Sequence, residues 1–144
     1  MSDIPSVMRA MVLHGHGDVD QYRLHNDWPV PVPGAMEVLV RVGACGVNNT
    51  DVNTRSGWYS KGVSEATTGG AFDSQQDEDS TWGGAPITFP RVQGADVVGE
   101  VVQLGEGVSE EWLGKRVMNA GWLRDWDDPE NLDKVGYFGS DPST

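Results

Sequence analysis

Positive charge and cysteine are scarce in this sequence of 144 residues, and each shortage excludes a class of function. Ten Lys and Arg residues stand against 22 Asp and Glu residues, so the formal net charge is −12. A surface this acidic repels phosphate backbones and anionic lipid, so we expect no nucleic-acid partner and no membrane partner. The single cysteine, Cys45, excludes an internal disulfide and any zinc site that needs several cysteines.

Long apolar runs are also missing. No stretch approaches the roughly 18 apolar residues of a membrane-spanning helix. The first residues lack the apolar core of a signal peptide, so we expect a cytoplasmic protein by elimination. The length and a hydrophobic content of 38% fit one domain with a modest core.

A glycine-rich phosphate loop is absent too. Gly15 and Gly105 each begin a G-x-G sequence, but Asp20 and Glu110 stand where a dinucleotide fingerprint has its third glycine. The acidic run at 77–79 lacks the spaced ligands of a calcium loop. Composition and local motifs therefore predict no self-contained active site.

The three histidines and the cysteine are expected to be structural. His14 and His16 stand two residues apart, which on a strand places them on one side and allows weak metal binding. We favour a turn that exposes both, and His25 has no candidate partner near it in sequence. Cys45 follows an apolar run, where a thiol is more often a small buried apolar side chain than a nucleophile.

Glycine and proline are frequent, with 19 and 8 residues, and they separate short apolar runs. Short apolar runs separated by glycine and proline are typical of a β-rich domain with tight turns. We predict strands at residues 8–14, 22–24, 36–42, 97–104 and 114–118. One helix is predicted at 48–56, capped by Asn48 or Asn49 and ended by Gly57. The predicted fold class is mainly β with short helices.

Two of these strands carry the clearest side-chain patterns. In the strand at 36–42, Val38, Val40 and Val42 are expected to share one face. In the strand at 97–104, strict alternation breaks, as it does in closed or strongly curved sheets.

Most of the acidity lies in two segments, 60–85 and 121–144, which each carry a net charge of −4. We expect the first to be a solvated acidic loop and the second a solvated acidic C-terminal segment. Residues 1–7 are predicted to be a disordered tail, and residues 8–120 a single domain that contains the acidic loop.

The order of the apolar runs and turns points to a known family. The stretches that carry the likeness are residues 9–12, 33–42, 45–51, 55–57, 90–102 and 114–117, together with Val108. Over about residues 8–120 the chain resembles the N-terminal, GroES-like catalytic domain of the medium-chain dehydrogenase/reductase superfamily. The resemblance implies a partly open β-barrel with a short helix after the third strand.

The resemblance also bears on zinc. In zinc-dependent members the turn equivalent to residues 46–51 carries a cysteine ligand, and here that position is Asn48. A second ligand is a histidine in a Gly-His-Glu sequence, and here Ala95 replaces it. Alanine cannot bind a metal, and an amide is a poor zinc ligand beside a thiolate. The chain therefore looks like the zinc-independent, quinone-oxidoreductase-like branch, which uses NADPH and no zinc.

The family pattern suggests roles for four residues of the predicted helix. Asn48 would donate hydrogen bonds near the nicotinamide or the substrate oxygen, Thr50 matches a proton-relaying hydroxyl, and Asn53 takes the place of a cleft-lining His or Tyr. Asp51, which with Asn48 would stand on the cofactor side, is expected to cap or brace the turn rather than to ionise in the reaction. For all four, simple capping of the helix is the alternative.

Family members continue into a Rossmann domain that holds the cofactor, and no such pattern occurs in this sequence. We therefore expect a catalytic-domain portion of a reductase, acting on a small carbonyl or quinone substrate once completed, and unable to bind NADPH alone. The sequence does not decide whether the chain forms a homodimer.

The main alternative is a freestanding GroES-like binding module without catalysis. Its contact surface would be marked by five tryptophans, Trp58, Trp82, Trp112, Trp122 and Trp126. A zinc-dependent alcohol dehydrogenase is a third and less favoured alternative.

Overall fold

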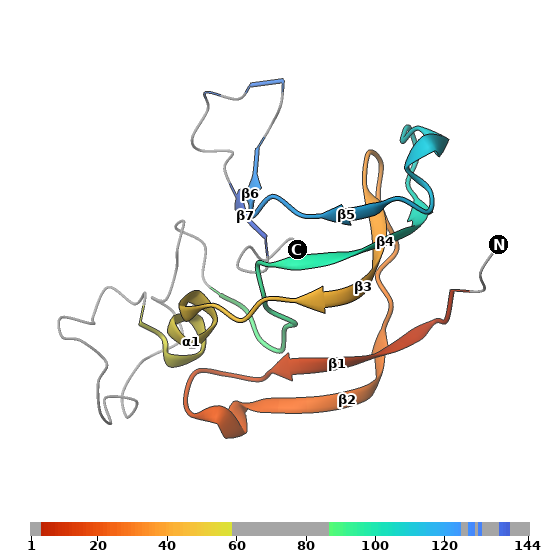
Figure 1. Ribbon diagram of the computed structural model, residues 1–144. Helices are drawn as coiled ribbons and strands as arrows, with labels where there is room; N and C mark the ends of the chain where they lie inside the picture. The colour runs from red at the N-terminus through yellow and green to blue at the C-terminus, as the bar shows by residue number, and fades with distance from the viewer. Residues whose placement is uncertain (1–3, 59–86, 125–126, 129, 131–135, 139–144) are drawn as a thin grey trace. The chain divides into compact units, whose positions relative to one another are not determined.

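The computed structural model describes residues 4–58, 87–124, 127–128, 130 and 136–138 (Figure 1). The predicted acidic loop 60–85 lies outside these residues, as do Trp82, Trp126 and much of the acidic segment 121–144.

Strands predominate among the described residues. In chain order the elements are β1 (Val7–Leu13), η1 (Val19–Gln21), β2 (Tyr22–Pro29), β3 (Val38–Cys45), α1 (Asn49–Ser56), β4 (Val97–Leu104), η2 (Glu110–Trp112), β5 (Arg116–Met118), β6 (Trp122–Leu123) and β7 (Gly136–Tyr137). The fold class, mainly β with short helices, is confirmed. Of the helices in the described part of the chain, none has the length and apolar content needed to cross a membrane.

The strands form three separate sheets, ordered β1-β2, β3-β4-β5 and β6-β7. In the described ranges these sheets do not close into a complete barrel, which agrees with the partly open barrel that the family resemblance implies. Prediction matched β4 at both ends, but β2 runs five residues beyond the predicted strand 22–24. Polar residues 25–27 give no strand pattern, yet their backbone groups can pair with a neighbouring strand as well as those of apolar residues.

The chain divides into two compact units, which we treat separately. The sheet unit comprises residues 1–10, 25–46 and 96–119, and the helix unit comprises residues 11–24, 47–95 and 120–144. Strands β1 and β2 each contribute residues to both units.

In the sheet unit, β4 is the central strand, antiparallel to β3 on one side and β5 on the other. The register between β3 and β4 shifts between Leu39 and Val40 and again between Val42 and Ala44. The first shift leaves Val102 of β4 as the extra residue, and the second leaves Gly43 of β3 as the extra residue, beyond the three valines. Val38 and Val40 are half-buried, whereas Val42 is 58% exposed. Val101 of β4 is almost fully buried and forms the core of this unit with Ala10.

In the helix unit, the buried apolar side chains are Val12, Leu13, Ile87 and Ala95. Leu13 exchanges two backbone hydrogen bonds with Arg91, at 2.8 and 2.9 Å. The segment before β4 is thereby fixed to the end of β1, and this segment leads to Gln93 and Ala95.

Candidate functional site

Helix α1 begins with a reciprocal capping box, which determines where the predicted site residues lie. The Asn48 backbone is extended, and its side-chain Oδ1 accepts a hydrogen bond from the Thr50 backbone N at 3.2 Å. The Asp51 Oδ2 accepts one from the Asn48 backbone N at 2.8 Å. Both residues thus satisfy amide groups that a helix start leaves without partners. The capping roles expected for Asn48 and Asp51 are confirmed.

The end of α1 also matches the prediction. Gly57 adopts a left-handed conformation with φ 68°, and its backbone N bonds to the Asn53 and Thr54 carbonyls. Glycine meets no steric penalty at such a φ, which explains why the helix ends there.

The four site residues predicted from the sequence occupy less than two turns of this helix. Asn48 is exposed, whereas Thr50, Asp51 and Asn53 are half-buried. The Asn48 Oδ1 accepts within the cap, and its Nδ2 is a hydrogen-bond donor on an exposed side chain. The Asn53 carbonyl accepts from the Ser56 Oγ at 3.1 Å and the Trp58 N at 2.9 Å, so its backbone is committed to the helix end.

The C-terminal half of α1 is fixed to the turn at residues 15–18 by buried polar groups. The Arg55 side chain, in a residue only 8% exposed, donates to the Gly17 carbonyl and lies 3.8 Å from the Asp18 carboxylate. The Gly17 backbone N donates to the Arg55 carbonyl at 2.9 Å. These bonds hold the helix against the turn by hydrogen bonding rather than by apolar contact.

The same turn corrects the prediction of two exposed histidines. His14 and His16 are half-buried. The Nδ1 of His16 lies 2.9 Å from the Thr54 carbonyl, and its ring meets the Phe89 ring edge-on with centroids 4.8 Å apart. A carbonyl only accepts, so Nδ1 carries the proton here. His16 is half-buried because it contacts α1, and Thr54 is 38 residues away in the sequence. The local sequence pattern could not reveal this contact.

The sequence analysis did not identify Gln93 and Tyr22, which are joined to the first turn of α1 by hydrogen bonds. The Gln93 Nε2 donates to the Asp51 carbonyl at 3.1 Å and also to the Tyr22 hydroxyl. Burial raises the pKa of Tyr22, and the nearby Asp51 carboxylate raises it further, while Arg55 and the Gln93 hydrogen bond act in the opposite direction. No local signal could have found this pair, because 71 residues separate its members.

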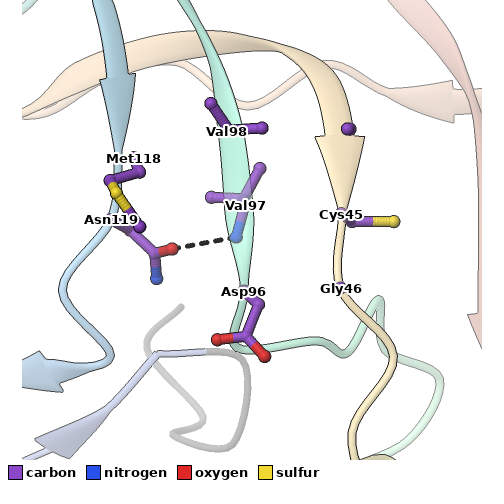
Figure 2. A pocket seen from close by; sticks show the side chains of 8 residues that line it. Cys45, Gly46, Asp96, Val97, Val98, Met118 and Asn119 are labelled. Atoms are coloured by element: carbon purple, nitrogen blue, oxygen red, sulfur yellow. Dashed lines mark hydrogen bonds between the residues drawn. The ribbon is translucent and has the colours of Figure 1, made fainter.

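The sheet unit contains an open hollow of about 300 Å³ where β3 and β5 end and β4 begins (Figure 2). Its lining includes Cys45, Asp96, Met118 and Asn119. The Asn119 Oδ1 accepts a hydrogen bond from the Val97 backbone N at 2.9 Å, and the Cys45 and Asp96 side chains point in different directions. Among the described residues, no hydrogen bond joins the Cys45 thiol to the Asp96 carboxylate.

The position of Cys45 corrects a second prediction. Its side chain is exposed rather than a buried apolar filler. Cys45 is the last residue of β3 and pairs with Val97 of β4. In the described residues β3 has no strand paired on its other edge, so the end of the strand stays open to solvent.

The donor groups near the predicted site do not fit a zinc ion. Within the described ranges, no three His, Cys, Asp or Glu side chains come together as metal ligands do. The Asn48 oxygen is engaged in the helix cap, and Ala95 presents a methyl group in a residue only 6% exposed.

Comparison with known proteins places this helix and sheet in a family. The sequence profile described as "Alcohol dehydrogenase GroES-like domain" matches residues 34–139, well over half of the chain. The chain belongs to this family. It is an N-terminal domain of the medium-chain dehydrogenase/reductase superfamily, as the resemblance implied.

Individual relatives agree with this assignment. Quinone oxidoreductase of Rattus norvegicus is 31% identical over 111 residues, which cover 77% of this chain and 26% of that protein. NAD-dependent alcohol dehydrogenase of Sulfolobus acidocaldarius is 32% identical over 118 residues, covering 82% and 28%. These relatives are oxidoreductases, so this GroES-like domain is similar to part of such an enzyme.

A solved structure supports the same fold. The crystal structure of a Sinorhizobium meliloti 1021 protein, provisionally assigned as an alcohol dehydrogenase, is 38% identical and superposes with a TM-score of 0.74. The match covers 97% of this chain and 36% of that one. The chain thus spans about a quarter of the length of the curated relatives and about a third of this structure.

Proposed function

We propose that this GroES-like domain is the catalytic-domain portion of a zinc-independent, NADPH-dependent oxidoreductase that reduces a quinone, an enone or a related small carbonyl compound. The observation that carries the proposal is the capping box of α1. Asn48 stands where the resemblance gives zinc-dependent members a cysteine, its Oδ1 is engaged in the cap, and its exposed side chain carries an amide NH₂ that can donate. A metal-binding side chain is thereby replaced by a hydrogen-bond donor.

In this proposal the chain's own residues supply orientation and hydrogen bonds. NADPH, when bound, supplies the hydride. The Asn48 Nδ2 donates to the substrate oxygen or the nicotinamide amide and stabilises negative charge as it develops on that oxygen. The Thr50 hydroxyl, two residues along the same turn, passes its proton to that oxygen and takes a replacement proton from water. Asn53, three residues after Thr50, lies on the same side of the helix as Thr50. Asp51 holds the turn on the cofactor side through its bond to the Asn48 backbone N.

The sequence gives no means of holding the cofactor's pyrophosphate. Neither G-x-G sequence has the third glycine of a dinucleotide fingerprint. We therefore propose that a nucleotide-binding domain provided in addition to these residues completes the site. We expect a titration of the purified chain with NADPH, followed by nucleotide fluorescence, to give no saturable change. Micromolar binding by these residues alone would contradict this part of the proposal.

The role of Asn48 can be separated from its capping role by two substitutions. Asn48→Asp keeps an N-cap acceptor but loses the amide donor, whereas Asn48→Ala loses both. In the protein that contains this chain and its nucleotide-binding domain, both variants are expected to lower NADPH-dependent quinone reduction by roughly 100-fold. Only Asn48→Ala is expected to destabilise the domain, by about 1 kcal/mol.

Asn49→Ala is the matched control, because Asn49 is also exposed but takes no part in the capping box. It is expected to leave both rate and stability unchanged. Full activity of Asn48→Asp would remove Asn48 from the reaction and leave it as a helix cap. Stoichiometric zinc in the active protein, measured by elemental analysis, would instead favour a metal-dependent alcohol dehydrogenase.

A binding module without catalysis is the second candidate, favoured by the exposure of tryptophan. Trp58, Trp112 and Trp122 are 41–56% exposed, which is unusual for so large an apolar side chain. The two functions differ in one measurement. A binding module shows no quinone reduction even when a nucleotide-binding domain and NADPH are both supplied.

A further inference from the structure

The Gln93 side chain donates a hydrogen bond to the first turn of α1 from a distant part of the chain. A peptide carbonyl can only accept a hydrogen bond, so the atom of Gln93 that meets the Asp51 carbonyl at 3.1 Å must be Nε2. The second proton of this NH₂ group is directed to the Tyr22 hydroxyl. Gln93 therefore joins the helix to the first residue of β2 through a single nitrogen.

The backbone that carries Gln93 is itself fixed. Two residues earlier, Arg91 exchanges two backbone hydrogen bonds with Leu13 at the end of β1. Leu13 is fully buried and Arg91 is 8% exposed, so this anchor lies in the core of the helix unit. Gln93 thus extends from a rigid support toward the Asp51 carbonyl.

Packing alone is a poor explanation for this residue. The Gln93 Oε1 is buried and has no hydrogen-bond partner among the described residues. A buried oxygen without a donor is unfavourable, and an apolar side chain of similar size would fill the space without that cost. What Gln93 offers, and an apolar residue does not, is the pair of donor bonds from Nε2.

We propose that Gln93 is a positioning residue, which sets the first turn of α1, and with it Asn48 and Thr50, by joining the Asp51 carbonyl to the Tyr22 hydroxyl. The catalytic meaning of that turn rests on the proposed function, but the hydrogen bonds themselves do not. The Tyr22 hydroxyl oxygen accepts one proton of the Gln93 NH₂ group, and the other proton of that group is donated to the Asp51 carbonyl. The two acceptors therefore use different protons.

The test is Gln93→Glu, which keeps the shape of the side chain and replaces the donor nitrogen by an acceptor oxygen. Burial raises the pKa of the introduced carboxyl group, so the comparison begins at a pH above that pKa. There a carboxylate faces the Asp51 carbonyl, and the NMR amide signals of Asn48, Thr50 and Asp51 are expected to shift. Acidification protonates the carboxylate and restores one donor, and the signals are expected to return toward those of the wild type at the same pH. A residue that only fills space gives no such recovery.

Gln93→Ala adds a measure of local stability. Amide hydrogen exchange in α1 is expected to accelerate by roughly threefold to tenfold, while exchange at Val101 in β4 stays at the wild-type rate. Tyr22→Phe is expected to give a smaller change in the same direction. The double variant is expected to change less than the sum of the two single variants, because both remove parts of one network.

Gln103→Glu is the matched control, since it makes the same chemical change on β4 in the sheet unit. It is expected to leave the α1 signals in place. The proposal is overturned if Gln93→Glu leaves the first turn unshifted, or if Gln93→Ala accelerates exchange equally in α1 and β4. Because neither readout needs NADPH or substrate, a failure here is distinct from a failure of the proposed reductase function.

Discussion

The two units of this domain are stabilised in different ways. In the sheet unit, β3, β4 and β5 are joined by a backbone ladder, and many side chains on these strands are exposed, such as Met118 at 80%. In the helix unit, α1 has few apolar residues, and the buried polar side chains Thr54, Arg55 and Ser56 lie in it.

The two units differ in how strongly their stability depends on a single side chain. A backbone ladder distributes its hydrogen bonds over many residues and is indifferent to most side chains. A helix of poor intrinsic propensity depends on the few side chains that bond it to its surroundings. The proposed reductase residues all lie in α1 or at its N-cap. Their placement is therefore sensitive to substitutions of the side chains that bond α1 to its surroundings.

The largest effect is expected where a side chain would enter the ladder itself. A Cβ on Gly99 of β4 would lie 2.3 Å from the Arg41 carbonyl oxygen, which is backbone and cannot move aside cheaply. Gly99→Ala is therefore expected to destabilise the protein by about 3 kcal/mol or more, measured by urea unfolding. Gly43→Ala on β3 is the control, because its nearest contact is the Val98 carbonyl oxygen at an ordinary 3.6 Å. Equal stability of the two variants would show that the strand pairing described here is wrong.

The next effect compares two arginines, one in each unit. Arg55 is buried and bonds to the Gly17 carbonyl, whereas Arg41 forms a 2.8 Å ion pair with Glu100 across exposed strands, with the two side chains 62% and 43% exposed. Arg55→Met leaves a buried carbonyl without its donor and is expected to cost about 2 kcal/mol. Arg41→Met removes a surface ion pair and is expected to cost less than about 1 kcal/mol. Similar unfolding midpoints for both variants would contradict the contrast between the units.

The smallest effect is a dependence on pH. The pKa of Tyr22 is raised above its usual value of 10.0 by burial and by the Asp51 carboxylate. The neutral phenol is therefore favoured in the folded state, and its contribution to stability is present below pH 10.0 and is lost as the pH rises through the folded-state pKa. We expect Tyr22→Phe to lose less stability than the wild type between neutral and strongly alkaline pH. Parallel stability curves for the two proteins would place Tyr22 outside this network.

Much of the fold followed from the sequence because its signals are local. The β-branched residues of 97–104 predicted β4 at its observed ends. Asn48 and Gly57 marked the two ends of α1 because capping chemistry depends only on near neighbours. The family likeness at residues 45–51 then indicated that the turn before α1 is the candidate site.

Other features depended on contacts that no local pattern encodes. The prediction that His16 is exposed was wrong because the ring bonds to Thr54, 38 residues away in sequence. The prediction that Cys45 is buried was wrong, since its side chain is exposed at the end of β3. The sequence of a strand does not record what covers each face of the sheet. The catalytic roles of Asn48, Thr50, Asp51 and Asn53, the cofactor and the domain boundaries stay predictions.

The sequence by itself determined the class of fold, the limits of the helix, the capping residues and the family, since each is written in neighbouring residues. Only the tertiary structure decided which distant side chains hold that helix in place, among them Arg55, Tyr22 and Gln93. Hydrogen bonds between groups far apart in the chain depend on distances that folding creates, and residue order records those distances only indirectly.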